Sequence, residues 1–422
     1  SRDWLNSLTD ENGNRIMNEE EPETDALQQH TFDGDLLGVN YGKSVSIAGD
    51  VNGDGFDDVI IGDPNGNGGG GINSGRAYIY FGGTLINNSV DVILTGGAVN
   101  NYFGRSVSAA GDVNSDGYDD VIVGADGYSS FTGRAYIYYG GASMNNVADV
   151  TFLGEAVGNL FGFSVSTAGD VNGDGYGDIL AGADQYSSGL GRSYIYYGGG
   201  VMNNTADVTM TGVVASDRFG RTVAYAGDLN GDSYSDIAVA SYRNDGVDSG
   251  KVFVYFGGTA MNNIADAVIY GETYYESLGW AISTAGDVNG DGYFDVIIGE
   301  SDATAPEANE GLARVLYGSP SRITILGITA LQRNQVGANL GTSVAEAGEV
   351  NGDGYADVVI GAPNFDNDEL NEGTLWVYLG GPAGILFASP VGVELNTAGD
   401  NFGFSVAGGG DTDGDGYSDI MG

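Results

Sequence analysis

The sequence predicts an all-β fold, a seven-bladed β-propeller of four-stranded antiparallel blades whose seventh blade is incomplete in this chain. Three observations predict it. One nine-residue string occurs seven times in the 422 residues. Short runs rich in Val, Ile, Tyr and Phe flank each copy, bounded by Gly, Asn and Asp, which is the signature of strands. No segment keeps the i, i+3, i+4, i+7 spacing of an amphipathic helix over three turns.

The string first appears as DVNGDGFDD at residues 50–58. It returns as DVNSDGYDD at 112–120, DVNGDGYGD at 170–178, DLNGDSYSD at 228–236, DVNGDGYFD at 287–295, EVNGDGYAD at 349–357 and DTDGDGYSD at 411–419. Successive copies begin 62, 58, 58, 59, 62 and 62 residues apart. A fixed period of this kind is the mark of a repeat architecture.

Each repeat contains four apolar runs in a constant order. In the second repeat they are FGRSVSAAG before the string, DVIVG at its end, GRAYIYYGG after a loop, and DVTFLG. A four-strand unit repeated around a ring leaves only short, protected sheet edges, which is the propeller solution. We expect blade repeats to start near residues 41, 103, 161, 219, 278, 340 and 402, within a propeller domain 30–422 that follows an acidic arm at 1–29.

The seventh repeat has only two of the four runs, because it stops at Asp419-Ile420-Met421-Gly422. Propellers often close by pairing strands from the two ends of the chain, and residues 30–34 (HTFDG) precede the first repeat where an outer strand would stand. The missing runs leave three alternatives. The natural chain continues past 422, residues 1–29 fill the blade, or a partner chain supplies a strand.

The charge of the chain restricts its partners. Asp and Glu number 58 against 14 Lys and Arg, for a net charge of −44. Nothing here would neutralise phosphates, so we expect no nucleic-acid partner and no anionic membrane surface. No apolar run approaches the roughly 20 residues of a membrane span, so we expect no direct membrane insertion. Cations are the natural partners of such a chain.

The composition also argues against catalysis. The chain has no cysteine and one histidine, His30, and it contains no G-x-S-x-G nucleophile motif. Thiolate chemistry is thereby excluded, and imidazole base catalysis and a His-ligated zinc site are nearly so. We therefore expect a binding or structural protein rather than an enzyme.

The recurring string carries oxygen ligands at alternate positions. Carboxylate or amide oxygens at positions 1, 3, 5 and 9, with a backbone carbonyl at position 7, suit a hard cation that takes six to eight oxygens. Glycine at position 6 permits the sharp turn. We therefore predict up to seven Ca²⁺ sites, whose ligand sets are Asp50, Asn52, Asp54, Phe56 and Asp58; Asp112, Asn114, Asp116, Tyr118 and Asp120; Asp170, Asn172, Asp174, Tyr176 and Asp178; Asp228, Asn230, Asp232, Tyr234 and Asp236; Asp287, Asn289, Asp291, Tyr293 and Asp295; Glu349, Asn351, Asp353, Tyr355 and Asp357; and Asp411, Asp413, Asp415, Tyr417 and Asp419.

Two other interpretations of the string exist. An acidic turn without an ion, in which Asp and Asn cap their own backbone, explains one copy but not seven in register. Mg²⁺ is the poorer ion, because it keeps its waters. Ser233 replaces the turn glycine in the fourth copy and Glu349 replaces the first Asp in the sixth, which weakens the prediction at those two sites. Asp413 adds a charge to the seventh.

The order FG-x-SV, then D-x-N-G-D-G-x-x-D, then V-I-x-G-A resembles the FG-GAP repeat, which builds the seven-bladed propeller of integrin α chains. The resemblance covers about residues 30–422. It implies calcium-bearing hairpins between the first and second strands of the blades, at the ligand positions given above. It also implies recognition outside the cell or at the cell surface, where calcium is high enough to fill such sites.

Because antiparallel strands alternate in direction, we expect the turns between third and fourth strands on the face of the calcium hairpins. The loops between second and third strands and the connections between blades should lie on the opposite face. Variable loops on a rigid scaffold usually carry function. Six residues there are candidates for a glycan or peptide ligand: Tyr128, Tyr186, Tyr242, Arg243, Tyr274 and Tyr275. The alternative is that these tyrosines only pack the loops. We predict a binding or adhesion module with a protein or glycan ligand; a propeller lectin and a subunit of a surface layer or filament are the alternatives.

Overall fold

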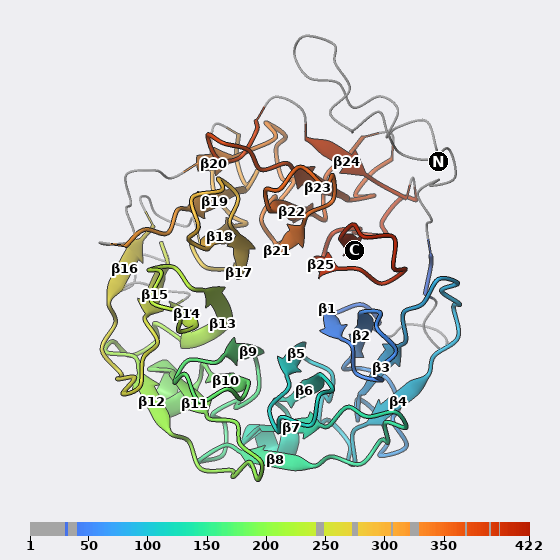
Figure 1. The fold of residues 1–422 in the computed structure, drawn as a ribbon, viewed down its shortest axis with the longest axis vertical. Coiled ribbons are helices and arrows are strands. Elements are labelled where there is room, and N and C mark those ends of the chain that lie inside the picture. The colour runs from blue at the N-terminus through green and yellow to red at the C-terminus, as the bar shows by residue number, and fades with distance from the viewer. Residues whose placement is uncertain are drawn as a thin grey trace.

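Seven β-sheets surround one axis in the computed structural model of the chain (Figure 1). The structure describes residues 30–32, 40–241, 249–271, 277–304, 307–320, 329–367, 369–387, 390–395 and 397–422. Six sheets have four strands each, in sequence order from the axis outward, and every neighbouring pair is antiparallel. The seventh sheet has two strands, so the predicted all-β propeller with a smaller seventh blade is observed.

The first three blades consist of β1 (Ser44–Gly49), β2 (Asp58–Asp63), β3 (Arg76–Tyr80) and β4 (Val92–Thr95); β5 (Val107–Gly111), β6 (Asp120–Ala125), β7 (Arg134–Tyr138) and β8 (Val150–Leu153); and β9 (Val165–Gly169), β10 (Asp178–Ala183), β11 (Arg192–Tyr196) and β12 (Val208–Thr211). The next three consist of β13 (Phe219–Gly227), β14 (Asp236–Ser241), β15 (Lys251–Tyr255) and β16 (Ala267–Tyr270); β17 (Ala281–Gly286), β18 (Asp295–Glu300), β19 (Leu312–Leu316) and β20 (Thr329–Leu331); and β21 (Ser343–Gly348), β22 (Asp357–Ala362), β23 (Thr374–Tyr378) and β24 (Val391–Val393). The seventh has β25 (Ala407–Gly410) and β26 (Asp419–Met421).

Two single helical turns interrupt the β pattern, α1 (Tyr128–Phe131) and α2 (Tyr186–Gly189). Both lie in loops between second and third strands, where the sequence predicts irregular chain. Two consecutive serines in each turn have positive φ, for example Ser129 at 49° and Ser130 at 60°. These turns are therefore tight loop closures and not helices that pack on the sheets.

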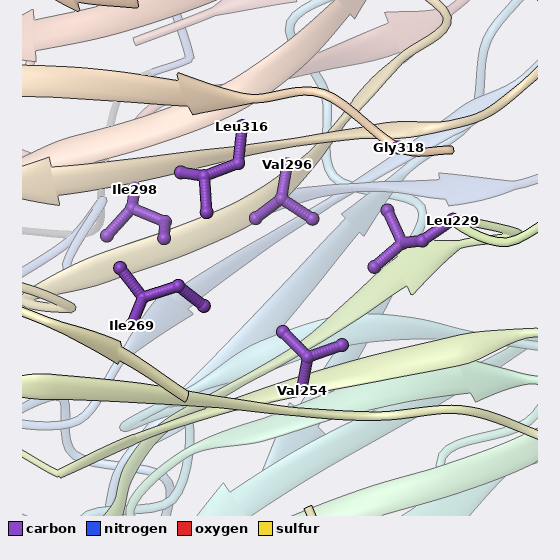
Figure 2. A pocket seen from close by; sticks show the side chains of 7 residues that line it. All are labelled: Leu229, Val254, Ile269, Val296, Ile298, Leu316 and Gly318. Carbon is purple, nitrogen blue, oxygen red and sulfur yellow. The ribbon is translucent and has the colours of Figure 1, made fainter. Parts of the chain in front are cut away.

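The core lies between adjacent blades. In the six four-stranded blades all residues of the second strand are buried, as in Asp58–Asp63, because these strands have a blade on either side. One cavity of about 10 Å³ remains between the fourth and fifth blades, and aliphatic side chains surround it (Figure 2). It is lined by Leu229, Val254, Ile269, Val296, Ile298, Leu316 and Gly318. A dry apolar space of this size is a packing defect and not a ligand site.

The first and seventh sheets complete the ring through direct backbone contacts. Asp57 N–H donates to the carbonyl of Asp411 (3.1 Å), and Gly83 N–H donates to that of Thr412 (2.8 Å). The sequence suggested that residues 30–34 form an outer strand of the seventh blade. The structure assigns no strand to 30–32, where the Phe32 ring instead lies 4.4 Å from that of Tyr80 in β3; residues 33 and 34 are outside the described part.

Candidate metal centres

Each nine-residue string forms the hairpin between the first and second strands of its blade. In the first blade, β1 ends at Gly49 and β2 begins at Asp58. A β-bulge at Gly49 aims the chain into the loop. Gly49 has φ +75°, and a Cβ there would lie 2.3 Å from Asp119 Oδ2 of the next blade. This glycine therefore permits both the turn and the close approach of the neighbouring blade.

The first carboxylate of the loop is surrounded by backbone donors. Asp50 Oδ1 accepts N–H bonds from Gly53 (2.7 Å) and Asp54 (3.0 Å), and its Oδ2 accepts one from Gly55 (2.9 Å). The third, fourth, fifth and seventh loops make the same three bonds. These bonds fix the orientation of the carboxylate and wrap the loop around it.

The residues at the third and fifth positions of the loop are joined by hydrogen bonds. Asn52 Oδ1 accepts the N–H of Asp54 (2.8 Å), while the Asn52 amide donates to Asp54 Oδ2 (2.9 Å). Asp54 Oδ1 in turn accepts the N–H of Phe56 (3.1 Å). The same turn would form without an ion, but it presents carboxylate and amide oxygens at alternate positions, which is what oxygen coordination requires.

The ninth residue is fully buried in the first six loops, whereas Asp419 of the seventh is partly buried. Asp58 is fully buried, and its two oxygens accept the N–H groups of Val51 (2.9 Å) and Gly82 (2.8 Å). Burial raises its pKa to about 7, against the lowering effect of these two hydrogen bonds. The equivalent aspartates of the next five blades also have pKa values raised to about 7 by burial: Asp120, Asp178, Asp236, Asp295 and Asp357. A buried carboxylate whose charge is not neutralised favours a proton or a cation.

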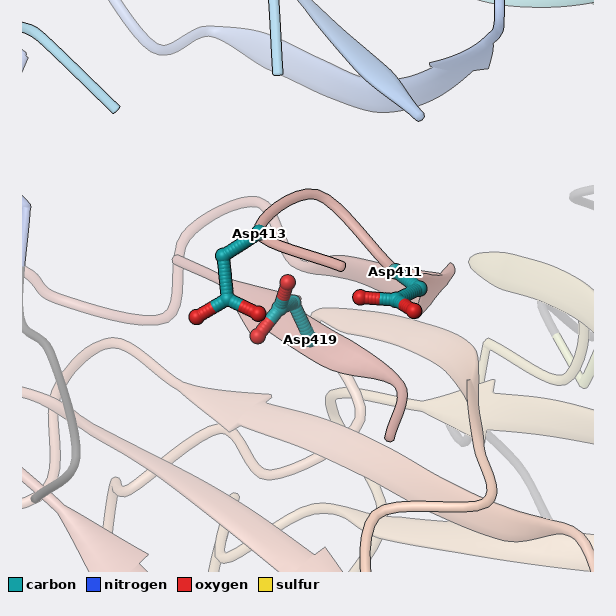
Figure 3. A group of neighbouring side chains, drawn as sticks. All are labelled: Asp411, Asp413 and Asp419. Atoms are coloured by element: carbon teal, nitrogen blue, oxygen red, sulfur yellow. The ribbon is translucent and has the colours of Figure 1, made fainter. Parts of the chain in front are cut away.

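The seventh loop brings three carboxylates together. Oxygen atoms of Asp411, Asp413 and Asp419 lie within 4.8 Å of one another, and the side chains point toward a common centre (Figure 3). Among the described residues this is the one group of three acidic side chains so close. The other six loops all have Asn in place of Asp413, and the sixth also has Glu in place of the first Asp.

The fourth and sixth loops, where the sequence departs from the pattern, behave differently. Ser233 takes the glycine conformation (φ +71°) and its N–H still donates to Asp228 Oδ2 (2.7 Å), so the fourth loop keeps its shape. In the sixth, Glu349 Oε1 is buried without a hydrogen-bond partner among the described residues. The longer side chain displaces the carboxylate from the donors that Asp50 uses, which supports a weaker sixth site.

Positions 7 and 8 have a role that the sequence analysis missed. At all seven interfaces the eighth residue donates its N–H to the first-position carbonyl of the preceding loop, as Asp119 does to Asp50 (3.2 Å). The aromatic ring at position 7 covers the fourth-position glycine of that loop; a Cβ at Gly53 would lie 2.4 Å from Tyr118 Cε1. The aromatic residue in every copy of the string was the signal. Each loop is thus built against its neighbour.

The candidate ligand residues are only partly described. Tyr128 and Tyr186 stand in the α1 and α2 turns, and each ring is covered by an arginine of its own blade, at 3.6 Å for Arg134 and 3.7 Å for Arg192. This supports the loop-packing interpretation for these two rings. Tyr242, Arg243, Tyr274 and Tyr275 lie outside the described residues.

An open hollow of about 560 Å³ borders Tyr128, between α1 and the connection that joins the first and second blades. Phe131, 45% exposed, and Val99, 56% exposed, line it with backbone and polar groups. The hollow is on the face opposite the acidic hairpins. In the described part of the chain, no helix has the length and apolar character needed to cross a bilayer.

Comparison with known proteins agrees with this architecture. The FG-GAP repeat family matches residues 41–80, 103–138, 161–196, 219–255, 278–316 and 341–378, together more than half of the chain. Each match begins at or next to the FG-x-SV segment and ends in the third strand of its blade.

Among the relatives are integrin alpha-5 of Xenopus laevis (33% identical over 215 residues), integrin alpha-V of Gallus gallus (33% over 214) and integrin alpha-PS2 of Drosophila melanogaster (32% over 217). Each alignment covers 47% of this chain, but only 20%, 20% and 15% of the respective relative. The chain thus spans about a fifth or less of the integrin chains that it matches. Six matched repeats in six consecutive blades show that this chain belongs to the FG-GAP repeat family, as an integrin α-like β-propeller.

Proposed function

We propose that the chain is a calcium-stabilised binding or adhesion module that works outside the cell or at its surface. One observation carries the proposal. The hairpin between the first and second strands is rebuilt in all seven blades with alternating oxygen ligands. The ligands are those named for each copy of the string, with the seventh loop the most acidic and the sixth the weakest.

Calcium would act on the ring as a structural cofactor. It would neutralise carboxylates that repel one another within a loop, and the loop contacts the next blade through positions 7 and 8. An ion that binds only the folded loop adds its binding free energy to the stability of the fold. The ligand, a protein or a glycan, would bind at the loops on the opposite face, where the hollow beside Tyr128 lies.

Removal of one ligand tests the metal assignment. Asp174→Asn changes the fifth position of the third loop, whereas Asp207→Asn changes an aspartate of the same blade that instead accepts the N–H of Tyr197. We expect Asp174→Asn to lower the calcium stoichiometry by one in isothermal titration, and Asp207→Asn to leave it unchanged. Melting temperatures that do not differ between excess calcium and excess chelator would contradict the proposal. A screen of immobilised glycans and matrix proteins, run with calcium and with chelator, tests the adhesion function.

A second candidate function is a subunit of a surface layer or filament. The sheet of β25 and β26 has two strands where the other sheets have four, and a strand from a neighbouring subunit would extend it at β26. Sedimentation analysis separates the two candidates. A concentration-dependent polymer favours the filament, and a monomer at all concentrations favours the adhesion module.

A further inference from the structure

The residue that follows the FG glycine marks one position in each repeat, before the innermost strand or, for Arg221, within its first residues. It is the end of the strand opposite the acidic hairpin, so these seven side chains belong to the opposite face. Three of them are cations and three are aromatic, and Thr342 stands in the sixth blade. We call the other six the axial belt: Lys43, Arg105, Phe163, Arg221, Trp280 and Phe404.

The members of the belt contact one another around the ring. The guanidinium carbons of Arg105 and Arg221 lie 4.7 and 4.4 Å from the centroid of the Phe163 ring. Arg221 is also 5.7 Å from Trp280. Lys43 Nζ lies 3.9 Å from the Phe404 ring, which joins the first blade to the seventh. Such cation–π contacts hold the cations in place and are stronger where water is excluded.

The three cations lie on one face of the ring, two of them against Phe163 and the third against Phe404. Burial, and then the positive charges of Arg105 and Arg221, lower the pKa of Lys43 from 10.5 to about 8. Like charges on one face repel one another unless an anion neutralises them.

The carboxylates near the belt are buried behind it. Asp184 is fully buried and lies 3.4 Å from Arg221 Nη1 and 3.8 Å from Arg218 Nη1. Asp126 is also buried, and burial raises its pKa to about 6 against the lowering effect of the Arg105 charge. Among the described residues, no carboxylate forms an ion pair with Lys43 or Arg105. In the described part of the chain, the belt therefore holds two cations, Lys43 and Arg105, that no carboxylate pairs with, although the net charge of the chain is −44 and it has only two lysines.

The geometry also indicates which anion fits. Arginine side chains already stack on Phe163 and Trp280, so these rings are not free to stack on a sugar. A guanidinium group that stacks through its face still has N–H groups at its edge, and these can donate to a carboxylate. The net charge of −44 opposes the approach of a long polyanion, such as an acidic polysaccharide, more than that of a short segment with few carboxylates.

We propose that the axial belt binds a carboxylate on a short acidic peptide segment of a protein partner, which enters along the propeller axis. The inference deepens the proposed binding function by naming the ligand class, and it rests on that function. It does not depend on the acidic hairpins, which are at the other end of the inner strands.

The experiment uses the whole chain in saturating calcium at pH 7 and a blocked peptide of sequence Gly-Glu-Asp-Glu-Gly. Its amide counterpart, Gly-Gln-Asn-Gln-Gly, is the matched ligand, and trigalacturonate represents an acidic glycan. Binding is followed by isothermal titration and by the fluorescence of Trp280, which contacts Arg221. Lys43→Gln with Arg105→Gln removes two belt charges without removing the Asp184 ion pairs. Arg134→Gln removes a stacked arginine of the second blade that is not in the belt.

We expect the acidic peptide alone to bind wild-type protein, and the double variant to bind it about tenfold or more weakly. Arg134→Gln and the charge-conserving Lys43→Arg with Arg105→Lys should retain binding, the latter showing that the belt folds. Equal binding by the double variant, or no binding by wild type, would overturn the proposal. Binding of trigalacturonate in place of the peptide would also overturn it, in favour of a glycan ligand. If the protein binds a ligand in the calcium screen but does not bind the peptide, the proposed function stands and this inference is overturned.

Discussion

At the scale of single residues, the ninth aspartate of the first six loops has the most strongly altered pKa in the candidate sites. Its burial was not evident from the sequence, which shows four acidic or amide residues of similar appearance. The structure separates them, because the first and fifth residues lie at the loop surface while the ninth begins a buried strand. The same carboxylate would bind the metal and accept backbone hydrogen bonds within the blade.

This burial predicts how calcium binding depends on pH. In six loops the ninth carboxyl has a folded pKa of about 7, above the ordinary value of 3.8, so it is protonated in the ion-free protein below that pH. Calcium must displace this proton. We expect calcium affinity to be constant above about pH 7.5 and to fall roughly tenfold at pH 6. Titrations at pH 6 and 8 would show this, and equal affinities would contradict it.

Glu346 offers a second titration that is independent of the metal sites. It extends from β21 across Gly286 toward Tyr225 of the fourth blade, and burial raises its pKa from 4.5 to about 7. Because the folded state disfavours its charge, it reduces stability progressively as pH rises from about 4.5 to 7. Glu346→Gln should raise the free energy of unfolding at pH 8 by about 1–2 kcal/mol and change it little at pH 4. Urea unfolding in saturating calcium at both pH values measures this, and a gain of equal size at both would refute the explanation.

At the scale of elements, the strands were predictable because their composition and bounds repeat. The runs DVIVG and RAYIY reappear as β6 and β7, with their register in the sheet set by antiparallel pairing. The α1 and α2 turns were not predictable, since serine rarely takes positive φ and only the closed loop requires it. The contact of each hairpin with the next blade was also missed, because it joins residues about one repeat apart.

This contact can be tested within one loop. Gly173 and Gly175 both have positive φ (+76° and +87°), so alanine strains the backbone at either position. Only at Gly173 would the new Cβ meet the next blade, 2.4 Å from Tyr234 Cε1, while nothing lies within 4 Å at Gly175. Gly173→Ala should therefore cost about 1–2 kcal/mol more than Gly175→Ala in urea unfolding with calcium. An equal loss of unfolding free energy for the two variants would mean that the Tyr234 ring does not stabilise the loop.

At the scale of the whole molecule, the repeat predicted a ring of seven sheets, and the fold required no other information. What the sequence left open was how the ring closes. The seventh blade meets the first with the same backbone bond that joins every other pair, and Asp57 Oδ2 accepts the N–H of Asp411 (2.9 Å) as Asp119 Oδ2 accepts that of Asp50 (3.0 Å). The axial belt was likewise hidden, since its members are about 60 residues apart and gather only when the ring forms.

Two equivalent substitutions compare the closure with an ordinary interface. Asp57→Ala removes a side-chain acceptor between the seventh and first blades, and Asp119→Ala removes its counterpart between the first and second. We expect both to lower the free energy of unfolding by a similar amount, about 1–3 kcal/mol, because each leaves one backbone N–H without its acceptor. Thermal melting with calcium present compares them. A much larger loss for Asp57→Ala would show that closure is the weakest interface.

The hydrogen bond from the eighth residue to the preceding loop has a kinetic consequence. Blades that contact only their neighbours form a one-dimensional array, and an open array unfolds from its ends. Here the last blade bonds to the first as the others bond to their neighbours, so every blade has a neighbour on both sides. Unfolding of any one blade must therefore break two interfaces before the ring has an open end. The closed ring should therefore unfold slowly, with a lifetime set by the rate at which its first interface opens.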